Sequence, residues 1–335
     1  MGKLDNYEVE GQMGLFDYIE DTVSEDKNYF ATMKPIRLIE LFSGIGSQAM
    51  ALRDLGISFE HYRTSEWDVN AILSYYAIHC SDDKTDYSKF YDFSEVVSCL
   101  DDWGISADGK NPLTREKVTK KGEKWCRKLF NAMVATKDIG SVSNATGEDL
   151  GIEDKDKYTY LLTYSFPCTD LSLAGKMRGM ERGSETSSSL LWQVERLLRE
   201  SEEKPDILLM ENVTQVHAAK NINLFEEWLG ILKEMGYSST WFDINAKDMG
   251  VPQNRDRCFC VSFLGNYDYE PPKTMELTKC MADLLEAETP EEYYINGDRA
   301  RNLINNLIVE GKIPDIDSFR EGVASTDSGD ELQQD

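Results

Sequence analysis

The sequence predicts an α/β fold in which helices cover both faces of a mostly parallel sheet. Short apolar runs alternate with helical patterns along most of the chain, a glycine-containing loop follows the first apolar run, and polar or charged residues stand directly after several later runs. Ligands of such folds bind at the carboxyl ends of the strands. We therefore expect the functional residues to follow the predicted strands.

The alternation of strands and helices begins at residue 36 and continues to residue 235. Short apolar runs predict strands at residues 36–41, 59–65, 160–164 and 207–210. Apolar residues that recur every three or four positions predict helices at residues 47–55, 69–79, 190–199 and 224–235. A last strand is predicted from Cys258 to Phe263, where the two cysteines alternate and share one buried face.

The rest of the chain divides into segments of different composition. We interpret the polar residues 80–147 as an insertion, with one amphipathic helix near Glu123 to Val134. The insertion lies within an α/β domain predicted at residues 34–270. Residues 1–33 are an acidic extension, and residues 271–335 are a short region with an acidic tail.

The composition predicts a cytoplasmic protein without a membrane segment. No run of about eighteen apolar residues occurs, and the N-terminus is acidic where a signal peptide would be basic. Seven cysteines form no Cys-x-x-Cys pair, which indicates reduced thiols and no metal site.

The charge balance argues against a nucleic-acid partner at first sight. The formal net charge is -25, whereas proteins that bind nucleic acids usually carry a basic surface. Much of the acid lies at the two ends of the chain. The one basic run, Lys110 to Lys128, is interpreted as a solvated helix face in preference to a phosphate contact.

A candidate nucleophile, Cys168, follows the strand predicted at residues 160–164. It stands in the sequence Ser165-Phe166-Pro167-Cys168. A proline beside a cysteine at a strand end places the thiol on a stiff, exposed turn that a substrate can reach. A cysteine alone is more often a small core residue. The other strand ends decide between these interpretations.

The ends of the first two strands carry residues suited to an adenosine. The loop Phe42-Ser43-Gly44-Ile45-Gly46 contains two glycines, which allow a tight turn and a close approach to a ligand at a helix N-terminus. After the second strand, Glu66 can accept hydrogen bonds from ribose hydroxyls and Trp67 can lie against an adenine. The alternative for the glycine loop is an ordinary turn between a strand and a helix. The alternative for the second block is that Glu66 caps a helix and Trp67 lies in the core.

Two further blocks bring charged groups to the same edge of the sheet. Glu211 follows the strand at residues 207–210 and can serve as an acid or base, or interact with the amides of a helix N-terminus. Arg255 and Arg257 precede the last strand, where they can act on a substrate or form surface ion pairs.

Together these blocks resemble the DNA cytosine-5 methyltransferases of bacteria and phages. The resemblance covers roughly Pro35 to Phe263 and rests on five blocks in order, at residues 42–46, 66–67, 166–168, 211–213 and 253–257. It implies a Rossmann-like methyltransferase fold, S-adenosylmethionine as cofactor and double-stranded DNA as partner. It also implies a role in restriction-modification or in phage anti-restriction.

The resemblance assigns the chemistry to four residues. Cys168 attacks carbon 6 of a cytosine that is flipped out of the duplex, which makes carbon 5 nucleophilic toward a methyl group. Glu211 holds or protonates ring nitrogen 3. Arg257, together with Arg255, stabilises the cytosine oxygen and orients Glu211. The contacts with the base and the DNA backbone are assigned to Ser172, Lys176 and Asn212.

The resemblance assigns other residues to the cofactor. Glu66 is assigned to the ribose and Trp67 to the adenine. Asp149 and Leu150 are assigned to the edge of the adenine. The remaining cofactor contacts are assigned to Phe42, Ser43, Gly44, Ile45, Gly46, Phe166 and Pro167.

Members of this family normally continue into a target-recognition domain, an arginine-rich block and a Gly-Asn motif, none of which we find in the sequence. We expect an enzyme that acts alone or one that is completed by a second chain carrying the recognition domain. Two other functions stay open: an RNA cytosine methyltransferase, and a remnant that binds S-adenosylmethionine or a protein without catalysis. The continuation Thr169-Asp170-Leu171-Ser172 favours DNA over RNA.

Overall fold

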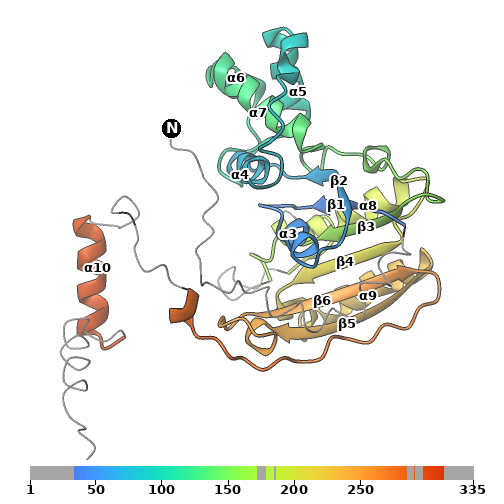
Figure 1. Cartoon of the computed structure of the whole chain (residues 1–335), viewed down its shortest axis with the longest axis vertical. Coiled ribbons are helices and arrows are strands. Elements are labelled where there is room, and N and C mark those ends of the chain that lie inside the picture. Colours follow the sequence, from blue (N-terminus) through green and yellow to red (C-terminus); the bar gives the residue numbers. More distant parts are fainter. Residues whose placement is uncertain (1–33, 172–178, 185, 285–289, 291–296, 313–335) are drawn as a thin grey trace, which may run out of the picture. The chain divides into compact units, whose positions relative to one another are not determined.

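The computed structural model describes residues 34–171, 179–184, 186–284, 290 and 297–312 (Figure 1). The chain divides into two compact units between Thr278 and Lys279. The second unit contains a short 3-10 turn, Met281–Leu284, and helix α10, Asp298–Val309. Among the described residues, no helix has the length and apolar character needed to cross a lipid bilayer.

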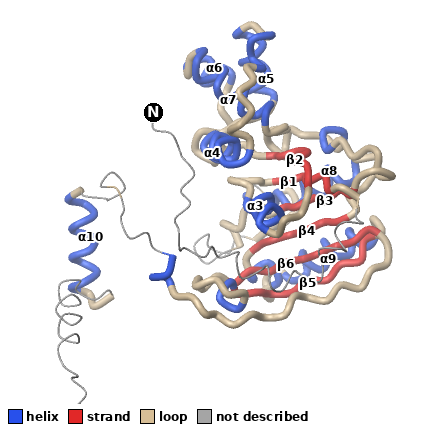
Figure 2. Tube along the Cα trace, in the orientation of Figure 1, coloured by secondary structure: helices blue, strands red, loops and turns tan. Residues whose placement is uncertain are grey.

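One mixed sheet of six strands organises the first unit, in the order β2-β1-β3-β4-β6-β5 (Figure 2). The strands are β1 (Ile36–Leu41), β2 (Phe59–Ser65), β3 (Thr159–Tyr164), β4 (Ile207–Asn212), β5 (Tyr237–Asn245) and β6 (Asp256–Leu264). Strands β1 to β4 pair in parallel, and β6 is antiparallel to both of its neighbours. Because β2 and β3 lie on opposite sides of β1, the carboxyl end of β1 is a topological switch point, where ligands bind in such sheets.

Helices cover both faces of this sheet, as the sequence predicts. The four helices that border it are α3 (Ser47–Asp54), α4 (Val69–His79), α8 (Leu191–Glu200) and α9 (Ile222–Glu234). On one face, Glu40 of β1 accepts hydrogen bonds from the backbone N–H of Ala49 in α3 and from the hydroxyl of Tyr75 in α4. On the other face, Ile39 and Leu41 pack in a core cluster with the buried side chains of α8 and α9. The alternation of side chains along β1 thus fixes both layers.

The described strands and helices confirm most of the predicted bounds to within two residues. The exception in the sheet is β5, which the sequence pattern does not predict. This strand lies at the edge and pairs with β6 alone. It therefore carries polar and partly exposed side chains, including Trp241 with 40% of its surface exposed, instead of an apolar run.

The insertion contains more regular structure than its sequence predicts. Helix α7 (Glu123–Ala135) confirms the one predicted helix, and α5 (Phe93–Asp102) and α6 (Arg115–Lys120) accompany it. The three helices form a second core, to which α4 contributes Val69 and Ile72. Figure 1 shows them gathered beyond α4, at one edge of the sheet.

Candidate active site

A cavity of about 900 Å³ lies at the carboxyl ends of β1, β2 and β3. The residues that end or follow these strands and line the cavity are Phe42, Ser65, Glu66, Trp67, Ser165 and Pro167. Further lining comes from residues 140–143 and from residues within 184–193, at the start of α8. The volume lies within the range of small-molecule binding sites.

The turn after β1 has a left-handed backbone at three positions. Phe42, Gly44 and Gly46 have φ angles of 57°, 55° and 82°. A Cβ atom at Gly46 would lie 2.4 Å from Nε2 of His79 and 2.6 Å from Cε2 of Tyr75, so both φ and packing require glycine there. Phe42 adopts this conformation without being glycine and lines the cavity, which is typical of residues at functional sites.

The carboxylate of Glu66 joins the ends of β1 and β2. Its Oε2 accepts the backbone N–H of Gly44 at 2.9 Å, and its Oε1 accepts those of Trp67 and Asp68 at 2.8 and 2.9 Å. Burial raises the pKa of Glu66 above its usual value. A carboxylate offers about four acceptor sites, so Glu66 retains acceptor capacity at the cavity that it lines.

A second carboxyl group, that of Asp138, lies behind Glu66. The segment after α7 extends the sheet at β2, where Asp138 pairs with Thr64. Oδ1 of Asp138 accepts the backbone N–H groups of Glu66 and Gly140 at 3.2 and 2.7 Å, and burial raises the pKa of Asp138 well above its usual value. The sequence pattern does not predict a role for Asp138. The signal that could have found it is an acidic residue followed by Ile139 and Gly140, directly after the predicted helix.

Asp149 and Leu150 are not among the residues that line the cavity, and their assignment to a cofactor stays a prediction. Oδ2 of Asp149 accepts the backbone N–H and the hydroxyl of Thr146 at 2.7 and 2.8 Å, which fixes the local turn. Leu150 is fully buried in the core of the sheet. Both residues therefore have structural roles.

The other residues assigned to a cofactor fall into two groups and one residue in the core, Phe166. Those that line the cavity are Phe42, Glu66, Trp67 and Pro167. Those that form the adjoining turn without lining the cavity are Ser43, Gly44, Ile45 and Gly46. Phe166 is buried in the core, and its carbonyl accepts a hydrogen bond from Nδ2 of Asn212 at 2.9 Å. Phe166 thus supports the loop that carries Cys168.

Cys168 is half-buried and stands between two residues that line the cavity, Pro167 and Thr169. The hydroxyl of Ser188 donates to the carbonyl of Pro167 at 2.7 Å, which ties the cysteine loop to the segment leading into α8. Cys168 therefore lies on a braced loop beside the cavity, and its side chain packs against the core cluster of the sheet.

Glu211 and the two arginines meet because β6 runs antiparallel to β4. The register pairs Glu211 with Phe259, so the first residues of β6 lie beside the last residues of β4. Nε of Arg257 lies 2.7 Å from Oε1 of Glu211, and Nη2 of Arg255 lies 3.9 Å from the same oxygen. Arg257 is therefore the direct partner of Glu211, and Arg255 is the more distant one.

Asn212 has a buried side chain. Its Nδ2 donates to the carbonyl of Phe166, and its Oδ1 accepts the backbone N–H of Val213 at 2.8 Å. Both ends of the amide are engaged within the protein, and the predicted contact with substrate stays a prediction. Ser172 and Lys176 lie outside the residues that the structure describes.

Comparisons with known proteins agree with this geometry. A family model described as C-5 cytosine-specific DNA methylase matches residues 36–99 and 109–322. The Type II methyltransferase M2.ScrFI of Lactococcus lactis subsp. cremoris is 34% identical over 267 residues, which cover 79% of this chain and 71% of that protein. The orphan methyltransferase M.SssI of Spiroplasma monobiae is 34% identical over 283 residues, which cover 82% of this chain and 69% of that protein.

Solved structures include the S. pombe Dnmt2 methyltransferase, which aligns with a TM-score of 0.48 at 17% identity. The alignment covers 82% of this chain and 66% of that one, just under two thirds of its length.

Proposed function

The chain belongs to the C-5 cytosine-specific DNA methylase family, and from this premise we propose that it methylates carbon 5 of cytosine in double-stranded DNA. The observation that carries the proposal is the position of Cys168 beside the cavity, one strand away from the Glu211–Arg257 pair. A restriction-modification role is supported by the Type II designation of M2.ScrFI.

The residues of the cavity fit S-adenosylmethionine, the methyl donor of this family. Glu66 keeps acceptor capacity for ribose hydroxyls, and Trp67 offers an aromatic ring to the adenine. We assign the edge of the adenine to the segment that begins at Asp138, because residues 140–143 line the cavity and residues 149–150 do not. The cofactor supplies an electrophilic methyl group bound to a sulfonium.

Cys168 starts the reaction as a nucleophile. Its thiolate adds to carbon 6 of a cytosine that has been flipped out of the duplex, and the electron pair of the 5,6 double bond makes carbon 5 nucleophilic. After methylation, a water molecule takes the proton on carbon 5, and the electron pair of that C–H bond restores the double bond as the thiolate leaves carbon 6. The braced loop holds the sulfur in place for both steps.

Glu211 and Arg257 stabilise the charge that develops on the base. Glu211 holds or protonates ring nitrogen 3, while the guanidinium of Arg257 fixes the orientation of the carboxyl group through the 2.7 Å contact. Arg255, at 3.9 Å from the same carboxyl oxygen, adds positive charge beside the cytosine oxygen.

The test is transfer of label from radioactive S-adenosylmethionine to unmethylated DNA. Cys168→Ala is compared with Cys280→Ala, because Cys280 is exposed and lies outside the cavity. We expect label in 5-methylcytosine with the wild type and with Cys280→Ala, and none with Cys168→Ala.

Label that persists in Cys168→Ala would contradict the mechanism. Label in transfer RNA without label in DNA would favour the RNA enzyme. Cofactor binding without label in either nucleic acid would favour a chain that needs a second chain or is catalytically inactive.

A further inference from the structure

The loop Ser106–Asn111 belongs to the insertion, yet it reaches the cavity. Asp108, Gly109 and Lys110 line the cavity together with Glu66 and Trp67. The family model does not match residues 100–108, so the first half of this loop is outside the region that the family shares. Residues 106–108 therefore lie outside the matched ranges, whereas residues 109–111 lie within them.

The loop is anchored on the residues that present Trp67. The backbone N–H of Ser106 donates to the carbonyl of Trp67 at 2.7 Å, and the carbonyl of Ser106 accepts the N–H of Val69 at 2.9 Å. Ser106 is fully buried and also pairs with Asp68 as a parallel bridge. These bonds connect the loop to the end of β2.

The loop also has a fixed internal conformation. Oδ1 of Asp108 accepts the backbone N–H groups of Lys110 and Asn111, each at 2.9 Å, and the hydroxyl of Ser106 at 3.1 Å. Gly109 has a φ of 63°, and a Cβ atom there would lie 3.4 Å from Oδ2 of Asp68. The loop therefore presents a preorganised wall to the cavity.

We propose that the loop Ser106–Asn111 is a wall of the cofactor site and that Lys110 determines how tightly the adenosyl end of the cofactor binds. The inference rests on the proposed function, which assigns Trp67 to the adenine. The loop lines the same cavity as Trp67, and the loop is also anchored to Trp67 by a backbone hydrogen bond. The adenosyl group is the part of the cofactor that lies against Trp67, so it is also the part within reach of this wall.

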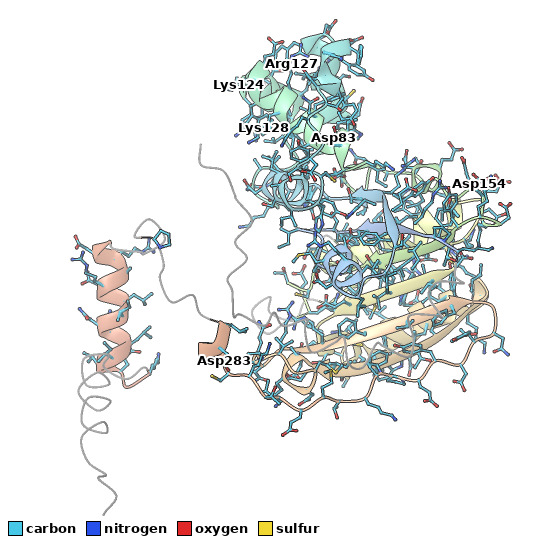
Figure 3. All side chains as sticks on the ribbon, viewed as in Figure 1. Asp83, Lys124, Arg127, Lys128, Asp154 and Asp283 are labelled. Atoms are coloured by element: carbon cyan, nitrogen blue, oxygen red, sulfur yellow. The ribbon has the colours of Figure 1, made fainter. Side chains whose placement is uncertain are left out.

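The test measures binding of two nucleosides by titration calorimetry with the full chain. S-adenosylhomocysteine carries the adenosyl group and the amino acid, whereas 5′-methylthioadenosine lacks the amino acid. Lys110→Ala removes an exposed side chain from the wall, and Lys124→Ala on α7 is the matched control because it removes an exposed lysine of the same insertion outside the cavity (Figure 3).

We expect Lys110→Ala to weaken both nucleosides equally, by about threefold to tenfold, because one polar contact is lost in each complex. Lys124→Ala should leave both dissociation constants within about twofold of the wild type. A variant that removes the internal turn, Asp108→Ala, should weaken both nucleosides in the same way.

Three results would overturn the inference while leaving the proposed function intact. They are unchanged binding of both nucleosides by Lys110→Ala, weakened binding of S-adenosylhomocysteine alone, and weakened binding of duplex DNA with unchanged nucleoside binding. The second would place Lys110 at the amino-acid end, and the third would place it on DNA phosphates. A wild-type chain that binds neither nucleoside would overturn the proposed function and this inference together.

Discussion

The position of Cys168 separates it from the two buried cysteines of β6. Cys258 and Cys260 are fully buried in β6, and burial raises the pKa of Cys260 to about 11. A thiol with a raised pKa forms little thiolate and is a poor nucleophile. Cys168 is instead half-buried and flanked by residues that line the cavity.

Glu211 is the carboxylate that pairs with Arg257. Glu211→Gln keeps the size of the side chain but removes its proton-transfer chemistry and its charge pairing with Arg257. We expect kcat to fall by about 100-fold or more, which is typical for loss of a general acid. The affinity for S-adenosylhomocysteine should not change, because Glu211 does not line the cofactor cavity.

The matched control is Glu226→Gln, which alters an exposed acid on α9 and should retain wild-type kcat. A kcat near the wild-type value in Glu211→Gln would contradict the assigned role. Loss of nucleoside binding would instead show that Glu211 acts on the cofactor site.

A second single-residue prediction concerns pH. Burial raises the pKa of Glu40 from 4.5 to about 7, while Tyr75 and Ala49 donate hydrogen bonds to its carboxylate. Because the folded chain holds a proton that the unfolded chain releases, this contribution to stability is fully present below about pH 4.5 and is lost as the pH rises through 7. The free energy of unfolding should therefore fall over this range by an amount on the order of 3 kcal/mol from this group.

Glu40→Gln removes that titration, so its free energy of unfolding should decline less between about pH 5 and pH 8 than that of the wild type. Urea unfolding at several pH values measures both slopes. Glu202→Gln, at an exposed position, should keep the wild-type slope. Parallel curves for Glu40→Gln and the wild type would refute the prediction.

At the scale of elements, the turn between β1 and α3 is the most constrained segment of the site. Gly44 and Gly46 both have positive φ angles, but only Gly46 is closely packed, against Tyr75 and His79. His79 also holds this turn directly, because its Nε2 lies 2.9 Å from the carbonyl oxygen of Ile45. The two glycines therefore form a matched pair for testing packing apart from backbone strain.

Gly46→Ala should destabilise the fold by at least about 2 kcal/mol, because the new methyl group meets the buried ring of Tyr75 and displaces His79. Gly44→Ala should cost only about 1 kcal/mol, from backbone strain alone, since no atom lies within 4 Å of its added Cβ. Chemical denaturation measures both values. Equal losses would mean that packing at Gly46 contributes nothing.

Sequence patterns predict the strands and helices whose buried residues recur at regular intervals. They miss segments that are held in place by pairing with strands distant in the sequence. Strand β1 and helix α8 have strong patterns, and the structure confirms their predicted bounds to within one residue. Helix α6 buries Val118 alone, so its sequence contains no apolar stripe to find. The position of Glu66 after a strand predicts its place in the site, whereas Asp138 enters the site through long-range pairing with β2, which the periodicity of the preceding helix does not indicate.

At the scale of the whole molecule, net charge opposes folding. The formal net charge of -25 produces repulsion that favours expanded states. Attractive ion pairs act in the opposite direction, for example Arg37 with Glu60 and Arg196 with Glu200. Partly exposed pairs of this kind contribute at most about 1 kcal/mol each, so the repulsion between many unpaired acids should dominate the response to salt.

We therefore expect the midpoint of thermal unfolding to rise as NaCl increases from about 0.02 to 0.2 M at constant pH, since the screening length falls below about 10 Å over this range. KCl at equal ionic strength should give the same rise, which would separate screening from binding of a particular ion. Scanning calorimetry of the full chain measures both series. A midpoint that falls with salt would show that the ion pairs outweigh the net repulsion, and the acidic excess would then have little effect on the stability of this fold.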